Sequence, residues 1–400
     1  MKKVSNRLYL ARKIFDYAIL VLLIIFLLFL WQLYRGPIAV PFLKPYIVAA
    51  LNPNVESAEV SVDSVNIELV RSVRPIKIIA NNVVYKRNDD SVRFSAPRTS
   101  VSFSIKALLR GIIAPASVEM EDPSVYIFTT YGVQEYDKAS VITEKKLDYY
   151  VTQFEDFLER FNSEDKTYPE SYINSISITG GEVEFHEVDL GRKWVLSDLN
   201  YDFNRGLSEI STAVSALLNL NDTVVSAGVD VGYRALDNKL AVQVYFGDLI
   251  PSEIINNYFD EKTRERLYQI NVPVSGKITA MIDFNEFVVN RDDLLLAVDK
   301  AVKDIGFQFE GGQGSIVFAA DDQESKYDIS SFVLDGHIKG GLDNLEIKNA
   351  DFNLGEQKVK LGFSASGLER LLLKSSFRDL KLKLTADIAS LKLNDLYILA

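Results

Sequence analysis

Hydrophobic and polar residues alternate along most of the chain after residue 58. Val101-Phe103-Ile105 alternates with serines, and Leu240-Val242-Val244-Phe246 alternates after a turn at Leu236-Asp237-Asn238. A period of two places apolar side chains on one face of a β-strand and polar side chains on the other. Many such runs, about a dozen residues apart and separated by Gly or Asn-Asp turns, predict antiparallel strands in a mainly β protein. The alternation shifts phase at Ser64, as it does at a β-bulge.

Turn residues divide this pattern into hairpins. Ile176-Ile178 and Val183-Phe185 flank Gly180-Gly181 and are expected to pair as a hairpin. Asp122-Pro123 predicts a turn between two further short strands. Roughly 25 strands at about 4.8 Å each would form a sheet about 120 Å long.

Helical spacing is rare in this chain. Apolar residues recur at three and four residues between Thr143 and Phe161, which predicts an amphipathic helix. A short apolar helix kinked by Pro45 is expected at Pro41 to Leu51, and another is expected to open at Ser252. It would bury Ile254, Ile255, Tyr258 and Phe259. The segment Asp292 to Val302 fits either a helix or a strand.

One continuous apolar run, Ala18 to Trp31, lies near the N-terminus. With its flanks it reaches the roughly 20 residues that a membrane-spanning helix needs. Tyr17, Trp31 and Tyr34 are suited to the two membrane interfaces. A cleaved signal peptide is the alternative, but no small-x-small cleavage site follows Trp31 closely, so an uncleaved anchor is favoured. The predicted anchor positions include Ala18, Leu22, Ile25, Leu28 and Trp31.

Charge orients this anchor and divides the chain. The first 35 residues carry a net charge of +5, whereas the whole chain carries −11, so the remainder carries −16. Five of the six basic residues in that leader precede the apolar run, which predicts a cytoplasmic N-terminus and an extracytoplasmic body. An acidic body is repelled by phosphates, so no nucleic-acid partner is expected. The chain has no Cys, so its core needs no disulfides.

These patterns suggest four parts. Residues 1–35 form the leader and anchor, and residues 36–140 form a first β block. Residues 141–169 hold the amphipathic helix and a polar linker, and residues 170–400 form a second, repeating β block.

The sequence contains no organised catalytic motif. His186 and His337 are the only histidines, which leaves little for a histidine triad or a multi-histidine metal site. Gly311-Gly312-Gln313-Gly314 lacks the helix and the Lys-Ser/Thr of a phosphate loop. The acidic cluster at Asp321-Asp322 lacks the spacing of a calcium loop. Acidic pairs are too numerous for any one of them to indicate glycoside cleavage. We therefore expect no enzyme activity, no cofactor and no metal site.

Several segments resemble AsmA-like envelope proteins, the superfamily that contains AsmA, TamB and YhdP. The resemblance begins with GPIAVPFLKPYIVAALN after the anchor and continues through APRTSVSFSIKALLRGIIAPASVEMEDPSVYIF. SISITGGEVEFHEVDLGRKWVLSDLNYDF is similar to the repeating unit of these proteins, and the later repeats are similar to the YhdP branch. The order of elements carries the resemblance more than any single motif does.

The resemblance implies an extended, curved β-groove with an apolar interior, anchored in the inner membrane of a Gram-negative cell with its body in the periplasm. The implied role is moving phospholipid toward the outer membrane or maintaining lipid homeostasis, so membrane lipids are the expected partners. The family brings no catalytic residues. The predicted groove-lining residues are Val101, Phe103, Ile105, Val183, Phe185, Val242, Val244, Ile316 and Phe318.

Three alternatives stay open at this point. A β-sandwich would bury the same apolar face as core, because alternation alone does not separate a groove from a sandwich. A scaffold for outer-membrane components could hold a periplasmic or outer-membrane protein through an open strand edge near Leu391 to Leu399. An anchored extracytoplasmic enzyme is the third alternative.

Overall fold

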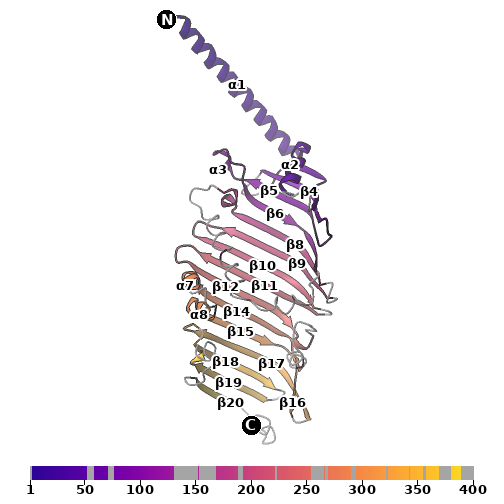
Figure 1. Cartoon of the computed structure of the whole chain (residues 1–400), viewed down its shortest axis with the longest axis vertical. Helices are drawn as coiled ribbons and strands as arrows, with labels where there is room; N and C mark the ends of the chain where they lie inside the picture. Colours follow the sequence, from indigo (N-terminus) through magenta and orange to yellow (C-terminus); the bar gives the residue numbers. More distant parts are fainter. Residues whose placement is uncertain are drawn as a thin grey trace.

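The computed structural model is one long curved sheet with a single helix projecting from its end (Figure 1). It describes residues 2–51, 58–70, 76–129, 152, 168–187, 192–220, 223–253, 265, 269–289, 294–320, 323–341, 343–354, 357–368 and 380–388. Within these residues all 20 strands belong to the same sheet, which confirms a mainly β protein with a curved sheet.

The strands nearest the helix form the upper end of the sheet in Figure 1. They are β1 (Ile38–Ala39), β2 (Ala58–Ser61), β3 (Ser64–Leu69), β4 (Ile76–Arg87), β5 (Val92–Phe103), β6 (Pro115–Glu121) and β7 (Ser124–Thr129). Both β2 and β3 pair with β4, and the break between them accounts for the phase shift at Ser64.

The middle and lower strands continue the sheet in chain order, with β13 and β16 as short additions. They are β8 (Ser175–Glu187), β9 (Arg192–Arg205), β10 (Glu209–Leu220), β11 (Thr223–Arg234), β12 (Lys239–Leu249), β13 (Ile270–Asn271), β14 (Val274–Asp283), β15 (Val302–Gly311), β16 (Gly314–Ala320), β17 (Gln323–Lys339), β18 (Asn344–Leu354), β19 (Gln357–Ser366) and β20 (Lys381–Ile388).

Among the residues that the structure describes the helices are few, as the spacing predicted. They are α1 (Lys2–Arg35), α2 (Lys44–Leu51), α3 (Ile105–Leu108), α7 (Phe284–Val289) and α8 (Leu294–Ala301), with short 3-10 turns η1 (Pro41–Leu43), η2 (Pro169–Tyr172) and η4 (Pro251–Glu253). The ambiguous segment from Asp292 is therefore helical at Leu294–Ala301. Its Ala297 and Ala301, about one helical turn apart, are both fully buried on one face of this helix.

Several predicted elements lie outside the described residues. These are the helix from Thr143 to Phe161 except Thr152, the apolar residues expected to follow Ser252 in a helix, and the terminal strand from Leu391.

The expected hairpin at Gly180-Gly181 is wrong, whereas Asp122-Pro123 does separate two short strands, β6 and β7. The residues Ser175 to Glu187 form one bent strand, β8, and β6 and β7 pair in turn with its two halves in parallel. Gly180 has φ +68° and Asp122 has φ +49°. β8 bends at Gly180, and the neighbouring segment from β6 to β7 bends beside it at Asp122, so neither segment reverses direction. The sheet is therefore mixed, not purely antiparallel, and β8 joins the two predicted β blocks in one sheet.

Candidate functional site

A single ladder of cross-strand partners runs through sixteen strands of the sheet, from β1 to β20. Each member lies directly opposite the next, so all of them occupy the same face. The members are Ile38, Ile67, Ile78, Val101, Val118, Ile176, Phe203, Thr212, Val231, Val242, Ala280, Ile305, Ile338, Leu345, Ala365 and Leu382. Only Thr212 is polar. We call this set the first apolar row.

A second apolar row lies two residues away on the same face. Its members are Val65, Ala80, Thr99, Met120, Ile178, Tyr201, Val214, Val229, Val244, Ile278, Phe307, Gly336, Ile347, Phe363 and Leu384. The two rows together make a continuous apolar face, and no charged residue interrupts either row.

The threonines in the two rows are unusual. The hydroxyl oxygens of Thr99 and Thr212 are buried and have no hydrogen-bond partner. A buried hydroxyl without a partner costs about 1–3 kcal/mol. At these two positions the apolar face therefore buries a polar group whose hydrogen-bonding capacity is not satisfied.

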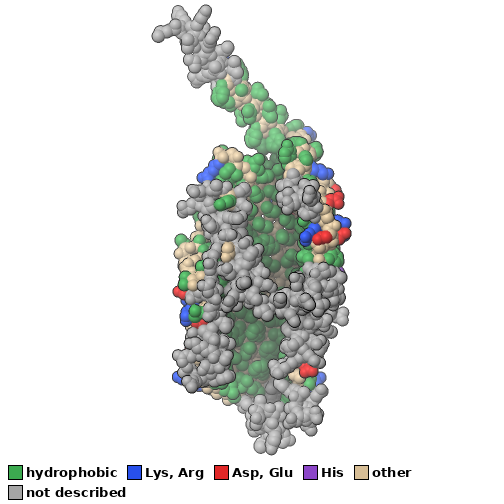
Figure 2. All heavy atoms as spheres, in the orientation of Figure 1, with side chains coloured by type: hydrophobic (Ala, Val, Ile, Leu, Met, Phe, Trp, Pro, Cys, Tyr) green, Lys and Arg blue, Asp and Glu red, His purple; other side chains and the backbone are tan. Residues whose placement is uncertain are grey.

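This face is packed at its upper end and exposes several of its apolar side chains farther down. Near α1, η1 and α2 lie over this face, and Val62, Val65 and Ala96 form a buried cluster there. Farther along, Val229 and Val244 are 37% and 38% exposed, and Leu382 and Leu384 are 61% and 67% exposed. Figure 2 shows hydrophobic side chains lining the hollowed face in the upper and lower parts of the body. Because all the described strands share one sheet, no second sheet covers this face within that part of the chain.

Six of the nine predicted lining residues lie on the apolar face. Val101 and Val242 belong to the first row, Val244 to the second, and Phe103 lies beside Val101 by alternation. Val183 and Phe185 of β8 lie opposite Leu196 and Trp194 of β9. Leu196 in turn lies opposite Leu218 of β10, which is on the same face as Val214 by alternation, so Val183 and Phe185 are on the apolar face as well.

The other three predictions have different outcomes. Ile105 is not in a strand: Ser104 caps α3, the chain leaves the sheet, and Ile105 is exposed to solvent. Ile316 and Phe318 lie in β16, which pairs with β13 and β17 and stands outside the sixteen-strand ladder. Most members of the two rows were not named from the sequence, although their alternation was visible. The missing information was the register between strands.

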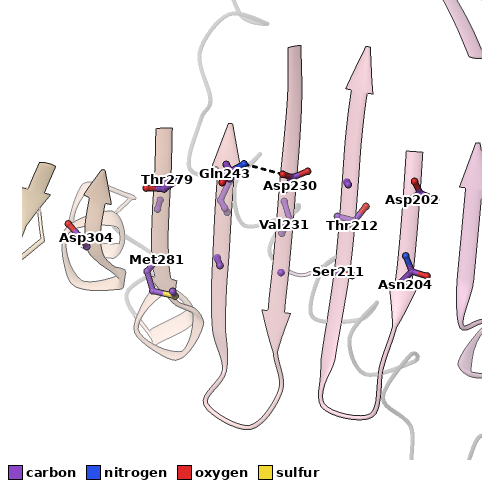
Figure 3. A pocket seen from close by; sticks show the side chains of 15 residues that line it. Asp202, Asn204, Ser211, Thr212, Asp230, Val231, Gln243, Thr279, Met281 and Asp304 are labelled. Carbon is purple, nitrogen blue, oxygen red and sulfur yellow. Dashed lines mark hydrogen bonds between the residues drawn. The ribbon is translucent and has the colours of Figure 1, made fainter. Parts of the chain in front are cut away.

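The opposite face of the sheet is polar and carries a shallow depression of about 590 Å³ across β9 to β15 (Figure 3). Small residues at Ala213, Gly232 and Ala241 form its floor, and Asp202, Asp230 and Asp304 stand around it. Gln243 Nε2 donates a hydrogen bond to Asp230 Oδ2 at 3.2 Å. Within the described residues, no group of three His, Cys, Asp or Glu side chains could hold a metal ion. The depression is therefore a surface hollow on the polar face of the strands that carry the apolar rows on their other face.

Both histidines contact carboxylates. His186 contacts Glu184, and Lys193 Nζ lies 2.9 Å from Oε1 of the same glutamate. Hydrogen bonds from Lys193 and from His186 hold the pKa of Glu184 below its usual range. His337 Nε2 lies 2.9 Å from Glu346 Oε2. Each of these contacts joins adjacent strands or residues two apart in one strand, as structural pairs do.

The N-terminal helix has the character of a membrane span. Residues Tyr17 to Arg35 have a mean hydropathy of 2.5, and 6% of them are buried. Among the described helices it is the one long and apolar enough to cross a membrane. The predicted anchor residues Leu22, Ile25, Leu28 and Trp31 are all exposed, and Ala18 is exposed as well. By contrast, Leu33 is buried where α1 meets β3, so the last turn of the helix is fixed to the sheet.

The chain matches no protein-family model and no curated protein.

Proposed function

We propose that this protein is a membrane-anchored lipid carrier that holds phospholipid acyl chains along the apolar face of its sheet. In this proposal it moves phospholipid between the inner and outer membranes, or maintains their lipid balance, as the resemblance to AsmA-like envelope proteins implies. The observation that carries the proposal is the first apolar row, which continues through sixteen strands on a face that no second sheet covers among the described strands.

The energetics favour an acyl chain as the occupant of this face. Each methylene group removed from water contributes about 0.8 kcal/mol, so a path for lipid must stay apolar along its whole length. The fifteen steps between neighbouring strands of the row span about 72 Å at about 4.8 Å each. The row is therefore more than twice as long as the hydrocarbon core of a bilayer is thick, about 30 Å, so it is long enough to hold an extended acyl chain. The polar headgroup can remain in water at the exposed positions of this face, such as Val244 and Leu384.

Site-specific photocrosslinking in cells tests the proposal. The full chain would carry a photoreactive benzophenone amino acid in place of Val242, on the apolar face, or in place of Gln243, on the polar face. Because these neighbours sit on the same strand, local folding and distance from the membrane are matched. We expect phospholipid adducts, identified by mass spectrometry, at position 242 and none at position 243. Equal yields at the two positions, or none at either, would refute lipid binding on this face.

The exposed lower end favours a second candidate function, a scaffold for outer-membrane components. Among the described strands β20 pairs only with β19, so its other edge could hold a partner strand. The same crosslinker in place of Thr385 on β20 would then capture protein, while position 242 would capture no lipid.

A further inference from the structure

The loop from Ser104 to Ala114, which contains α3, projects large apolar side chains into solvent. Ile105, Leu108, Leu109 and Ile113 are 74%, 51%, 85% and 75% exposed. Four such residues within nine positions are unusual for a connection between two strands, since loop tips are normally polar. An exposed apolar patch of this kind marks a surface that a protein or a membrane covers.

The loop has a defined structure rather than an open one. Ser104 accepts a hydrogen bond from the Ala107 backbone N–H at 3.3 Å, and Ile112 N donates to Ala107 O at 3.0 Å. Ala107 and Ala114 are fully buried against Tyr172. The small residues thus pack inward and the large apolar ones point outward, which is the reverse of how a loop lowers its own free energy in water.

The position of the loop points to its partner. Figure 1 shows α3 and α2 at the upper end of the sheet, the end from which α1 leaves. Phe42 and Tyr46, in η1 and α2, are also exposed at this end. The bilayer that α1 crosses would therefore lie beside these residues.

The charge of the loop fits an anionic lipid surface. Between Ser104 and Ala114 the chain carries Lys106 and Arg110 and no acidic residue, although the whole protein has a net charge of −11. Arg110 also donates to the Tyr172 hydroxyl at 3.3 Å, which holds the guanidinium at the base of the loop. Apolar side chains next to basic ones are the pattern of segments that rest in a membrane interface, with the cations at the phosphate level.

We infer that the α3 loop is a second membrane contact, which inserts Leu108, Leu109 and neighbouring apolar side chains into the outer part of the bilayer that α1 spans. Together with α1 it holds the upper end of the sheet against the lipid surface. The inference needs α1 in a bilayer and does not depend on lipid transport.

A fluorescent label tests this contact in the full chain. Because the protein has no Cys, the substitution Leu109→Cys gives a single labelling site for an environment-sensitive nitrobenzoxadiazole dye. The labelled protein is reconstituted into vesicles of roughly three parts phosphatidylethanolamine to one part phosphatidylglycerol, with or without bromine on the acyl chains. We expect emission at shorter wavelength and severalfold quenching by the brominated lipid.

Two matched controls define the outcomes. Val289→Cys labels the short helix α7, where Val289 is 78% exposed and lies farther from α1, so its emission should stay water-like and unquenched. Leu28→Cys labels α1 and should be quenched. Quenching at position 28 without quenching at position 109 would overturn the inference. A blue shift at position 109 without bromolipid quenching would also overturn it, because the loop would then be covered by protein. Adducts at position 242 report separately on the proposed function.

Discussion

Val244 on β12 lies directly opposite Val229 on β11, and each of these paired side chains keeps more than a third of its surface exposed. A cross-strand valine pair in the middle of a large sheet is normally covered by a second layer. Here the pair belongs to a face that the described strands leave uncovered, and this difference separates a groove from a sandwich core.

The substitution Val244→Asp tests that difference. Because Val244 is 38% exposed, the carboxylate can stay hydrated, and we expect a loss of less than about 1 kcal/mol in the free energy of unfolding. Lipid crosslinking at the nearby position 242 should fall strongly, since a charge now lies in the apolar path. Chemical denaturation in detergent and adduct yield measure the two effects.

Val65→Asp is the matched comparison in the same apolar row. Val65 is 2% exposed beneath α2, so an unpaired buried charge there should cost more than about 3 kcal/mol. If Val244→Asp and Val65→Asp both lose more than about 3 kcal/mol in the free energy of unfolding, the face is a closed core at both positions.

Removing the unpartnered hydroxyl of Thr212 should stabilise the protein. Valine has nearly the same shape, so Thr212→Val removes a buried polar group without creating a cavity, and we expect a gain of about 1 kcal/mol. Thr385→Val is the control, because its hydroxyl donates to Gly362 O at 3.2 Å and its loss should be neutral or destabilising. Unfolding midpoints of the two variants would show the contrast. If Thr212→Val were destabilised, the Thr212 hydroxyl would have a hydrogen-bond partner other than the described strands, and the prediction would be wrong.

The paired bend at Gly180 and Asp122 should be sensitive to a single methyl group. A Cβ on Gly180 would lie 2.3 Å from Asp122 Oδ1, and its φ of +68° strains any L-residue, so Gly180→Ala should cost about 1–2 kcal/mol. Gly206→Ala, at a turn without that φ, is the control. Because Asp122 itself has φ +49°, thermal unfolding of Asp122→Gly with and without Gly180→Ala isolates the steric part: the loss from Gly180→Ala should be smaller when the Asp122 carboxylate is absent.

Stability should depend on acid pH through Glu184. Hydrogen bonds from Lys193 and His186 lower its pKa in the folded protein, so the carboxylate stabilises the fold above the pKa of the unfolded chain, about 4.3. This stabilisation is lost as the pH falls through the lower, folded value. Near neutral pH the free energy of unfolding of the wild type should exceed that of Glu184→Gln by less than about 1 kcal/mol. The two free energies should converge in acid. A gap that persists at low pH would assign the effect to packing.

The orientation of α1 is testable with single cysteines. Lys3→Cys should resist a membrane-impermeant maleimide in cells whose outer membrane alone is permeabilised, whereas Leu236→Cys, at an exposed turn of the body, should react. Labelling of both positions would place the N-terminus outside the cytoplasm.

The sequence by itself determined the long apolar N-terminal helix, the mainly β fold and the positions of most strands, because hydrophobic run length and period-two alternation are local properties. It also placed Val101, Phe103, Val242 and Val244 on an apolar face. The local pattern failed where context mattered: Ile105 continues the alternation but follows a helix cap, and Gly180-Gly181 bends a strand instead of reversing it.

Only the tertiary structure decided how the strands align. Register is a relation between segments distant in the chain, and a shift of one residue would move every apolar side chain to the other face. The alignment brings Ile38 and Leu382 into one apolar row and leaves that row without a covering sheet among the described strands. Only the structure placed the α3 loop at the same end of the sheet as α1, because distance along the chain does not reveal which loops share one end of a sheet.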